Sequence, residues 1–338
     1  MIHNCQREAV TLVQLGPLET TDVEQALYRA NELQHPFLFN SDFYRDRLPL
    51  EDRYRLPNGG YDLCSAVKDA LLKNRKYKKL PRPLLVMSSA ALGDPDFPDE
   101  PEGFYFCSQE DDYDPQVTII STYPSKHLPN RTLEAYVLMM LSTHILSAYA
   151  NISYHRTLRG CLLDYCDEWT DVENCFRVGA LCDDCEVEIQ KRVRRNQVSI
   201  ERVAAAIRLL NKAVGRKYCF VVMPFTEDLN PVYKVIHETL VEKGWKVKRA
   251  DEISFPRLIT GRIFQEILSS DLVVADLTGS NPNVFYEVGL THAVGNDLLL
   301  VSQNEIPIDL KNEQTVFYRL EDLNSLKSAL QHYVGSGG

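Results

Sequence analysis

Carboxylate side chains gather late in the chain at positions typical of a ligand site. In residues 276–289, DLTGSNPNVFYEVG, Asp276 closes an apolar run, and Glu287 lies about one and a half turns inside the helix that follows. Asn281 is suited to cap that helix and Pro282 to occupy its first position. Neighbouring apolar runs carry three more acids: Asp251, Glu252 and Asp271. Carboxylates suit a sugar, because its hydroxyls need acceptors and its anomeric carbon gathers positive charge when a glycosidic bond breaks.

A second set of residues could bind a metal ion. Cys161 and Cys166 form a C-x4-C pair, and fifteen residues later Cys182 and Cys185 form a C-x2-C pair. Four thiolates in two close pairs are what a tetrahedral structural zinc site requires, so we expect one zinc ion on these residues. The alternative is a group of buried free thiols, and Cys175, between the pairs, is expected to pack in a helix as a bystander. The other cysteines are interpreted as small apolar side chains: Cys5, Cys64, Cys107 and Cys219.

The elements that must position the carboxylates alternate between strand and helix. We expect strands at 217–225, 245–250, 271–276, 297–302 and 314–320, and helices at 230–244, 257–270, 281–295 and 323–334. This alternation implies a doubly wound parallel sheet with helices on both faces, and right-handed crossovers favour the flavodoxin-like strand order 2-1-3-4-5. A ligand would then bind beyond the carboxyl ends of the strands, beside 223–225, Asp251 and 276–283. The phosphate-binding motifs G-x-G-x-x-G and G-K-[ST] are missing there, which argues against a Rossmann dehydrogenase or a P-loop enzyme.

Residues 1–185 have a different character and are expected to form a separate α+β domain. They are rich in proline and tyrosine, with an acidic stretch at 93–115. We expect strands at 82–92 and 116–123 and a long apolar helix at 131–152. A charged helical stretch at 186–216 is expected to connect this domain to the second one, which covers 217–338.

Composition restricts the partners and the compartment. The chain has 338 residues, of which 44% are hydrophobic and 25% charged, as expected for a globular protein of two domains. A net charge of −10 argues against a protein that mainly binds nucleic acid, and the basic run at 190–197 is interpreted as a solvated helix face. No apolar run approaches the ~18 residues that a membrane span needs, and the first residues show no signal segment. Together with cysteines clustered as metal ligands, this predicts a cytoplasmic protein.

The second domain resembles the nucleoside 2-deoxyribosyltransferase-like superfamily, which is related to the Toll/interleukin-1 receptor-type NAD hydrolases. The resemblance covers about residues 217–320 and rests on MPF at 223–225, ADLTG at 275–279 and NPNVFYEVGLTHA at 281–293. It implies that Glu287 is the nucleophile at the anomeric carbon and that Asp271 positions the sugar. Asn281 stands where the family has a second aspartate, and Asp276 is expected to substitute for that acid. The residues expected to contact the substrate are Met223, Pro224, Phe225, Asp251, Asn281 and Asn283.

The same resemblance implies a reaction and a biological setting. Family members with NPNVFYE are often effector domains of bacterial antiphage systems, where cleaving an N-glycosidic bond of NAD or a related nucleotide stops growth. Two other interpretations stay open. Glu287 could be an exposed surface residue, or a partner of Arg249 or Arg262, while Asp276 only caps its loop. Alternatively, the domain could be a non-catalytic nucleotide-sensing module.

The first domain resembles the archaemetzincin family of zinc proteases over about residues 80–185. In that family an H-E-x-x-H-x-x-G-x-x-H helix leads into a structural zinc site of C-x4-C and C-x2-C pairs. Here His144 matches the first histidine, but Ile145 replaces the glutamate base, Ala148 the second histidine, and Gly160 precedes the first zinc cysteine. Without these groups no water is activated, so we interpret the domain as a pseudo-protease rather than an active metalloprotease.

This domain is expected to bind a protein partner or form a homo-oligomer, and to gate the second domain. His144 and His155 are expected to be packed or hydrogen-bonded residues rather than metal ligands.

Overall fold

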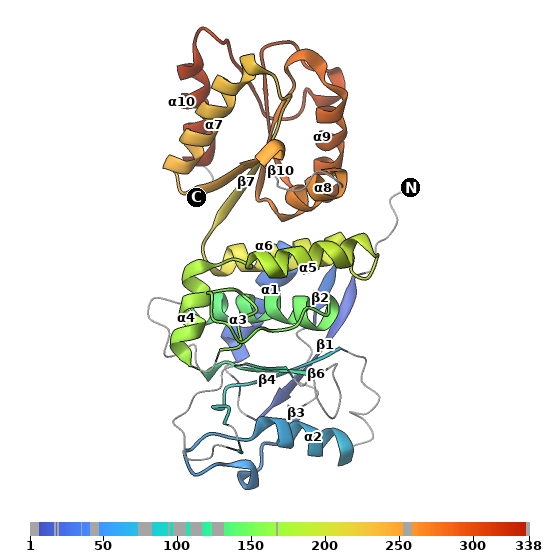
Figure 1. Cartoon of the computed structure of the whole chain (residues 1–338), viewed down its shortest axis with the longest axis vertical. Helices are drawn as coiled ribbons and strands as arrows, with labels where there is room; N and C mark the ends of the chain where they lie inside the picture. Colours follow the sequence, from blue (N-terminus) through green and yellow to red (C-terminus); the bar gives the residue numbers. More distant parts are fainter. Residues whose placement is uncertain are drawn as a thin grey trace. The chain divides into compact units, whose positions relative to one another are not determined.

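The computed structural model describes residues 7–16, 18, 20–34, 36–40, 47–73, 83–93, 95–96, 106–108, 117–123, 132–166, 168–252 and 259–335. The chain divides into two compact units, Met1–Val214 and Gly215–Gly338 (Figure 1). Within the described ranges, every helix is too short or too polar to cross a membrane.

The first unit contains a six-stranded sheet. Its strands are β1 (Glu8–Leu15), β2 (Phe37–Phe39), β3 (Arg47–Leu48), β4 (Leu84–Ser88), β5 (Phe106–Ser108) and β6 (Val117–Ser121). They follow the order β2-β1-β4-β6-β5, with β3 also paired to β1. β5 runs antiparallel to β6, while the other described pairings are parallel. All residues of β4 and β6 are buried, as expected for parallel strands covered on both faces.

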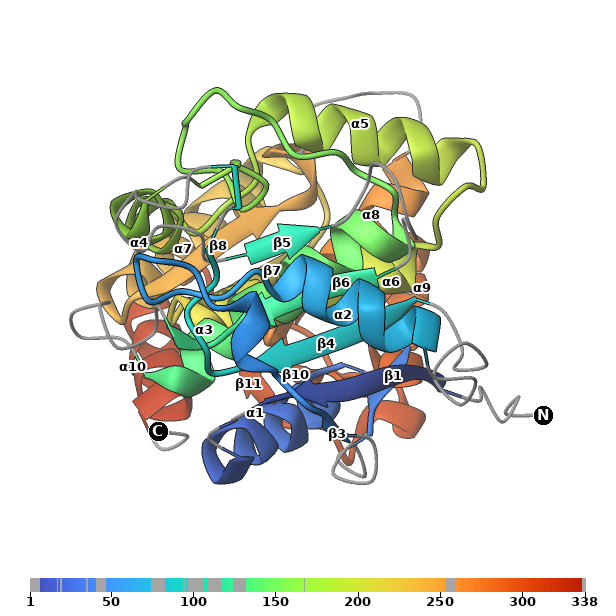
Figure 2. The same cartoon turned by 90° about the horizontal axis from the view of Figure 1, so that it is seen from below.

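Helices cover both faces of this sheet. Apolar residues that alternate along the strands separate into two clusters, because successive side chains of a strand point to opposite faces. One cluster packs with α1 (Thr20–Leu33), α3 (Leu133–His144) and α6 (Ile200–Ala213). The other packs with α2 (Leu63–Lys73), which lies across the sheet in Figure 2. The predicted helix at 131–152 is confirmed as α3 and a π-helical turn at Ile145–Tyr149.

The stretch predicted as a connector, 186–216, belongs largely to the first unit. It contains most of α5 (Asp183–Arg194) and all of α6, and α4 (Trp169–Val178) precedes it. Val203 and Leu210 of α6 are buried in the same cluster as α3, and the Ser142 hydroxyl donates to the Ala206 carbonyl at 2.7 Å. The amphipathic face of α6 therefore completes the core of the first unit.

The second unit is the predicted doubly wound sheet. Its strands are β7 (Lys217–Val222), β8 (Trp245–Arg249), β9 (Leu272–Asp276), β10 (Asp297–Ser302) and β11 (Thr315–Phe317). They are parallel in the order β11-β10-β9-β7-β8, which is the predicted order 2-1-3-4-5. One face packs with α7 (Asn230–Glu242) and α10 (Leu323–Gly335), and the other with α8 (Ile259–Ser269) and α9 (Pro282–Val294) (Figure 1).

Local sequence signals set the ends of α9. The Asn281 side chain accepts a hydrogen bond from the backbone N–H of Asn283 at 2.9 Å, and Pro282 occupies the first turn. Gly295 ends the helix at φ 71°, a left-handed conformation that glycine adopts without strain. The helix that carries Glu287 therefore begins and ends as predicted.

Candidate functional site

Most of the predicted substrate-binding residues lie at one edge of the second sheet. Residues 223–225 follow β7, Asp251 follows β8, and Asp276 ends β9. Asn281 and Asn283 stand at the start of α9. Because the strands are parallel, their carboxyl ends share an edge, where ligands of doubly wound sheets bind.

Glu287 is a half-buried carboxyl on α9. The core-facing residues of the helix are Val284, Val288 and Thr291, and Glu287 lies beside them at the border of the buried face. Desolvation raises the pKa of Glu287 to about 7. Among the described residues no salt bridge or hydrogen bond to this carboxylate offsets the desolvation. A carboxyl with this pKa can exchange a proton near neutral pH, or face a positive charge once it is ionised.

The flank of α9 that carries Glu287 faces α8. On the opposite flank, His292 Nε2 lies 3.3 Å from the Glu313 carboxylate, close to the start of β11. His292 is five positions after Glu287, which places the two side chains about 140° apart around the helix. Glu287 therefore lies toward α8, which packs beside α9 and follows the segment 253–258, outside the described residues.

The proposed pairing of Glu287 with Arg249 does not occur. The Arg249 guanidinium is bound by both carboxylate oxygens of Asp251, with Nε–Oδ1 at 2.7 Å and Nη2–Oδ2 at 2.6 Å. It also lies over the Tyr233 ring at 4.2 Å and near the Phe225 ring at 5.7 Å. The side chain of Arg262, the other suggested partner, lies outside the described residues.

Asp251 and its neighbour Glu252 are therefore engaged within the protein. Glu252 accepts a hydrogen bond from the Tyr233 hydroxyl at 2.6 Å and another from the Arg249 backbone N–H at 3.2 Å. The Phe225 side chain remains 60% exposed beside this cluster, while Met223 is buried. Asp251 thus fixes Arg249, and Phe225 offers an apolar ring at the carboxyl edge of the sheet.

Asp276 is fully buried within a polar network. Its Oδ1 accepts from the Thr278 backbone N–H at 2.9 Å, and its Oδ2 accepts from the Tyr318 hydroxyl at 2.7 Å. Gln303 Nε2 lies 3.3 Å from the same hydroxyl, and Thr278 Oγ1 lies 3.2 Å from it. Burial raises the pKa of Asp276, although the hydrogen bonds from Thr278 and Tyr318 act in the opposite direction. These hydrogen bonds hold the loop after β9. They agree with the alternative interpretation in which Asp276 caps this loop.

Sequence reasoning missed Tyr318 and Gln303. Tyr318 lies 42 positions from Asp276, and the two meet because β9 and β11 both pair with β10. The predicted strand order could have identified Tyr318, since it places the ends of these three strands side by side.

The placement of Asp271 corrects the expectation that it positions the sugar. This residue precedes β9, at the amino edge of the sheet, and the five residues of β9 separate it by about 16 Å from the carboxyl edge. Its Oδ2 accepts from the Tyr218 backbone N–H, and its own N–H donates to the Tyr218 carbonyl, both at 2.8 Å. Asp271 therefore joins the starts of β7 and β9, away from any crevice at the opposite edge.

The second unit also has a surface pocket of about 470 Å³. It is lined by Glu305, Ile306, Lys311, Glu313, Thr315 and Phe317. Glu313 contacts His292, on the flank of α9 opposite Glu287, and none of the residues predicted to contact a substrate lines this pocket.

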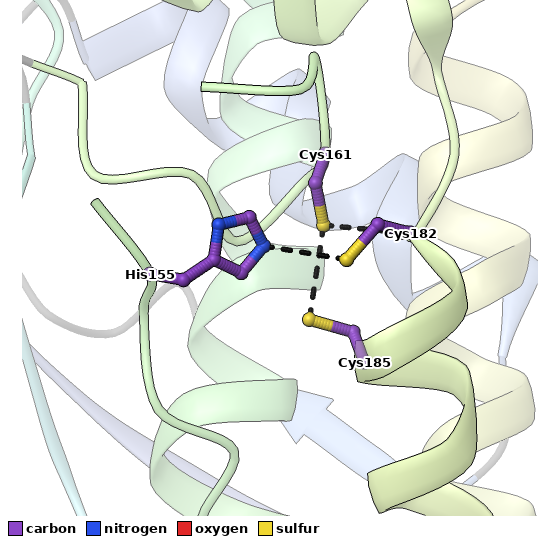
Figure 3. A group of neighbouring side chains, drawn as sticks. All are labelled: His155, Cys161, Cys182 and Cys185. Carbon is purple, nitrogen blue, oxygen red and sulfur yellow. Dashed lines mark hydrogen bonds between the residues drawn. The ribbon is translucent and has the colours of Figure 1, made fainter. Parts of the chain in front are cut away.

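In the first unit, four side chains form a group that could hold a metal ion: His155, Cys161, Cys182 and Cys185 (Figure 3). Their ligand atoms all lie within 4.8 Å of one another. The set corrects the prediction in two ways, because His155 belongs to it and Cys166 does not. Cys166 Sγ instead lies 3.8 Å from the sulfur of Cys175, the predicted bystander.

Hydrogen bonds favour a thiolate within this group. Cys161 Sγ accepts from the backbone N–H groups of Leu163 at 3.4 Å and Cys182 at 3.3 Å. The Cys185 sulfur lies 3.8 Å from it, and the contact between the two sulfurs is the largest cause that lowers the pKa of Cys161 to about 5. A thiolate is the form in which cysteine binds metals.

His144 is packed and hydrogen-bonded, as predicted. It is fully buried, with Nδ1 2.8 Å from the Thr118 hydroxyl and its ring edge against Tyr149. Burial lowers the pKa of His144 to about 3, so the imidazole is neutral. Ile145 and Ala148 follow it in the π-helical turn and supply no metal ligand.

Comparison with known proteins finds no matching family model and no matching curated protein. A solved CMP N-glycosidase from Clostridium botulinum is 22% identical over 35% of this chain and 100% of that chain, with a TM-score of 0.28. A 2-deoxyribosyltransferase from Bacillus psychrosaccharolyticus is 16% identical over 33% of this chain and 95% of that one, with a TM-score of 0.27. A flavo di-iron protein mutant from Thermotoga maritima is 12% identical over 62% and 54%, with a TM-score of 0.30. Likeness at these scores assigns no activity to this chain.

Proposed function

We propose that the second unit is an N-glycosidase that cleaves the bond between the sugar and the base of a nucleoside or nucleotide. The observation that carries this proposal is the desolvated carboxyl of Glu287, whose pKa is raised to about 7. Among the described residues no cation and no hydrogen-bond donor to this carboxylate offsets the desolvation. It lies in the first half of α9, the helix that starts from the carboxyl edge of the sheet. Groups with perturbed pKa values beside such an edge are typical of functional sites.

Glu287 would act on the anomeric carbon. As the bond from carbon to base nitrogen breaks, its electron pair leaves with the base, and the sugar carbon gains positive charge. The ionised Glu287 carboxylate stabilises this charge or bonds to the carbon. Water then supplies the hydroxyl of the product, and its remaining proton goes to the released base or to solvent. Phe225 offers an exposed ring for the base, and Asn281 and Asn283 lie at the same edge for polar contacts.

We extend the proposal to NAD as the substrate and to antiphage defence as the setting. NAD suits a desolvated carboxyl because its nicotinamide nitrogen is cationic, so substrate binding itself favours the ionised form of Glu287. The first unit would gate the reaction in the cytoplasm as a degenerate protease that contacts a protein partner or a second copy of the chain. It would contain one structural zinc ion, which the sulfur and nitrogen atoms of Figure 3 suit.

A non-catalytic nucleotide-binding module is the second candidate. It is favoured by the internal pairing of the other acids at this edge, since Asp251 binds Arg249 and Asp276 binds Tyr318. Among the described acidic residues at the carboxyl edge, Glu287 would thus be the one carboxylate available to contact a substrate. A sensing module would bind the nucleotide and leave it intact.

Base release separates the two candidates. The purified full chain would be incubated with NAD, CMP and a set of ribonucleosides and deoxyribonucleosides, and free base measured by chromatography beside equilibrium binding. We expect release from at least one substrate, and a loss of about 100- to 1,000-fold in Glu287→Gln. Glu321→Gln, at an exposed acid of the same unit, is the matched control and should keep the parent's rate. Binding without release in the parent would favour the sensing module.

A further inference from the structure

The spacing of the Cys/His group in the first unit matches a tetrahedral zinc ion. Zinc–sulfur bonds of about 2.3 Å and a zinc–nitrogen bond of about 2.0 Å place two sulfurs about 3.8 Å apart, and a sulfur and a nitrogen about 3.5 Å apart. Cys161 Sγ and Cys185 Sγ are separated by 3.8 Å, and His155 Nε2 lies 3.4 Å from Cys182 Sγ. These two edges therefore have the lengths of a coordination tetrahedron, and the other four are no longer than 4.8 Å.

The hydrogen bonding of His155 leaves its Nε2 free to bind a metal. Its Nδ1 lies 3.0 Å from the Thr157 carbonyl oxygen, which can only accept a hydrogen bond. Nδ1 must therefore carry the proton, and in the neutral ring Nε2 then has the lone pair. Nε2 lies on the side of the sulfurs, as Figure 3 shows.

Asp164 holds the loop that carries Cys161 and lies beside this histidine. Its Oδ2 accepts three backbone N–H groups, from Arg159 at 2.8 Å, Gly160 at 2.7 Å and Cys161 at 3.1 Å. Its Oδ1 lies 3.2 Å from His155 Nδ1 and has no hydrogen-bond partner among the described residues. The Asp164 side chain is 1% exposed, so its charge acts in a poorly solvated place.

Cys166 is directed to a different partner. Its Sγ lies 3.8 Å from Cys175 Sγ and 3.5 Å from the Asp164 carbonyl. Cys175 Sγ in turn lies 3.0 Å from the Cys161 carbonyl. These contacts place the Cys166 thiol in a pair with Cys175 and outside the group of four ligand atoms.

We propose that the chain binds one zinc ion through His155 Nε2 and the thiolates of Cys161, Cys182 and Cys185, with Asp164 as the positioning residue and Cys166 outside the coordination shell. Four protein ligands close the tetrahedron, so the site has no open position for a substrate and is structural. It ties the loop at 155–161 to the start of α5. Three thiolates around a divalent ion leave one negative charge, and Arg159 Nη1 lies 3.8 Å from Cys182 Sγ to offset it. The proposal is independent of whether Glu287 cleaves a substrate.

The test compares His155 with Cys166. The full chain would be purified without chelator and loaded with zinc alone, with metal content measured by elemental analysis and ligand types by X-ray absorption at the zinc edge. The parent and Cys166→Ser should each bind one zinc ion through three sulfurs and one nitrogen. His155→Cys should bind one zinc ion through four sulfurs. This variant replaces His155→Ala in the comparison if the alanine variant fails to fold. Four sulfurs in the parent, or loss of zinc or of a sulfur ligand in Cys166→Ser, would overturn the proposal.

The role of Asp164 needs a separate measurement. Asp164→Asn should weaken zinc binding about 10- to 100-fold in competition with a chelator, as is typical when a residue that orients a ligand is changed. In the His155→Cys background the same substitution should have a much smaller effect, because a cysteine has no Nδ1–H to orient. An equal loss in both backgrounds would show that Asp164 only supports the loop at 159–161, and would contradict its positioning role.

Discussion

The desolvated carboxyl of Glu287 should make the stability of the second unit depend on pH, and Glu287→Gln should remove that dependence. The pKa of this group is raised from 4.5 to about 7 in the folded protein. Between these two values the folded state binds more protons than the unfolded state, so stability falls as the pH rises. Glutamine has a similar shape and stays neutral, so the variant does not lose the stability that the parent loses when Glu287 ionises.

The magnitude follows from the size of the shift. Each unit of pKa corresponds to about 1.4 kcal/mol, which gives about 3.4 kcal/mol for the whole shift. The side chain is only half-buried, and solvent reduces this value to about 1.5–2 kcal/mol. The free energy of unfolding of Glu287→Gln should therefore equal that of the parent at pH 4.5 and below. At pH 8 it should be about 1.5–2 kcal/mol larger than that of the parent.

Tryptophan fluorescence can report this difference. The chain has two tryptophans, so a Trp169→Phe background leaves Trp245 of β8 as the probe of the second unit. Urea unfolding would be recorded at pH 4.5 and pH 8 for Glu287→Gln and for the exposed control Glu321→Gln. If the free energy of unfolding of Glu287→Gln at pH 8 is equal to or smaller than that of the parent, Glu287 is not desolvated in the folded protein.

Three further outcomes are expected. Tyr318→Phe removes the hydroxyl that donates to Asp276, and should destabilise the second unit by about 1–3 kcal/mol in urea unfolding; an unchanged midpoint would contradict the buried network. Gly160→Ala should destabilise the first unit by about 1–3 kcal/mol through its positive φ alone, and by more because the added Cβ would clash with Val178 Cγ2. Gly244→Ala, which has a positive φ but open space around the added Cβ, is the control. Removal of zinc by a strong chelator should make the first unit susceptible to protease while the second stays resistant, and a first unit that is equally resistant without metal would count against a structural ion.

The second unit was predictable because its signals are local. The alternation of apolar strands and amphipathic helices gave its strand order, and Asn281, Pro282 and Gly295 gave the ends of α9. Position along a strand also determines the edge at which a residue lies. Asp271 was misassigned because an acid that starts a parallel strand lies at the edge opposite to the crevice.

The errors in the metal group have a different cause. Cysteine spacing shows which thiols lie near one another, but it does not determine the direction of each side chain. The backbone bridge between His155 and Asp164 brings the histidine to the sulfurs, while Cys166 faces Cys175. Neither the bridge nor the pairing of Tyr318 with Asp276 follows from local sequence, because each joins residues through the tertiary fold.

The role of Glu287 in bond cleavage is tested most directly by the rate at which the full chain releases free base from the substrate identified among NAD, CMP and the nucleosides. The ratio of kcat/KM between the parent and Glu287→Gln should be about 100 to 1,000, with Glu321→Gln within a factor of two of the parent. A folded Glu287→Gln protein that releases base at the parent's rate would contradict the account.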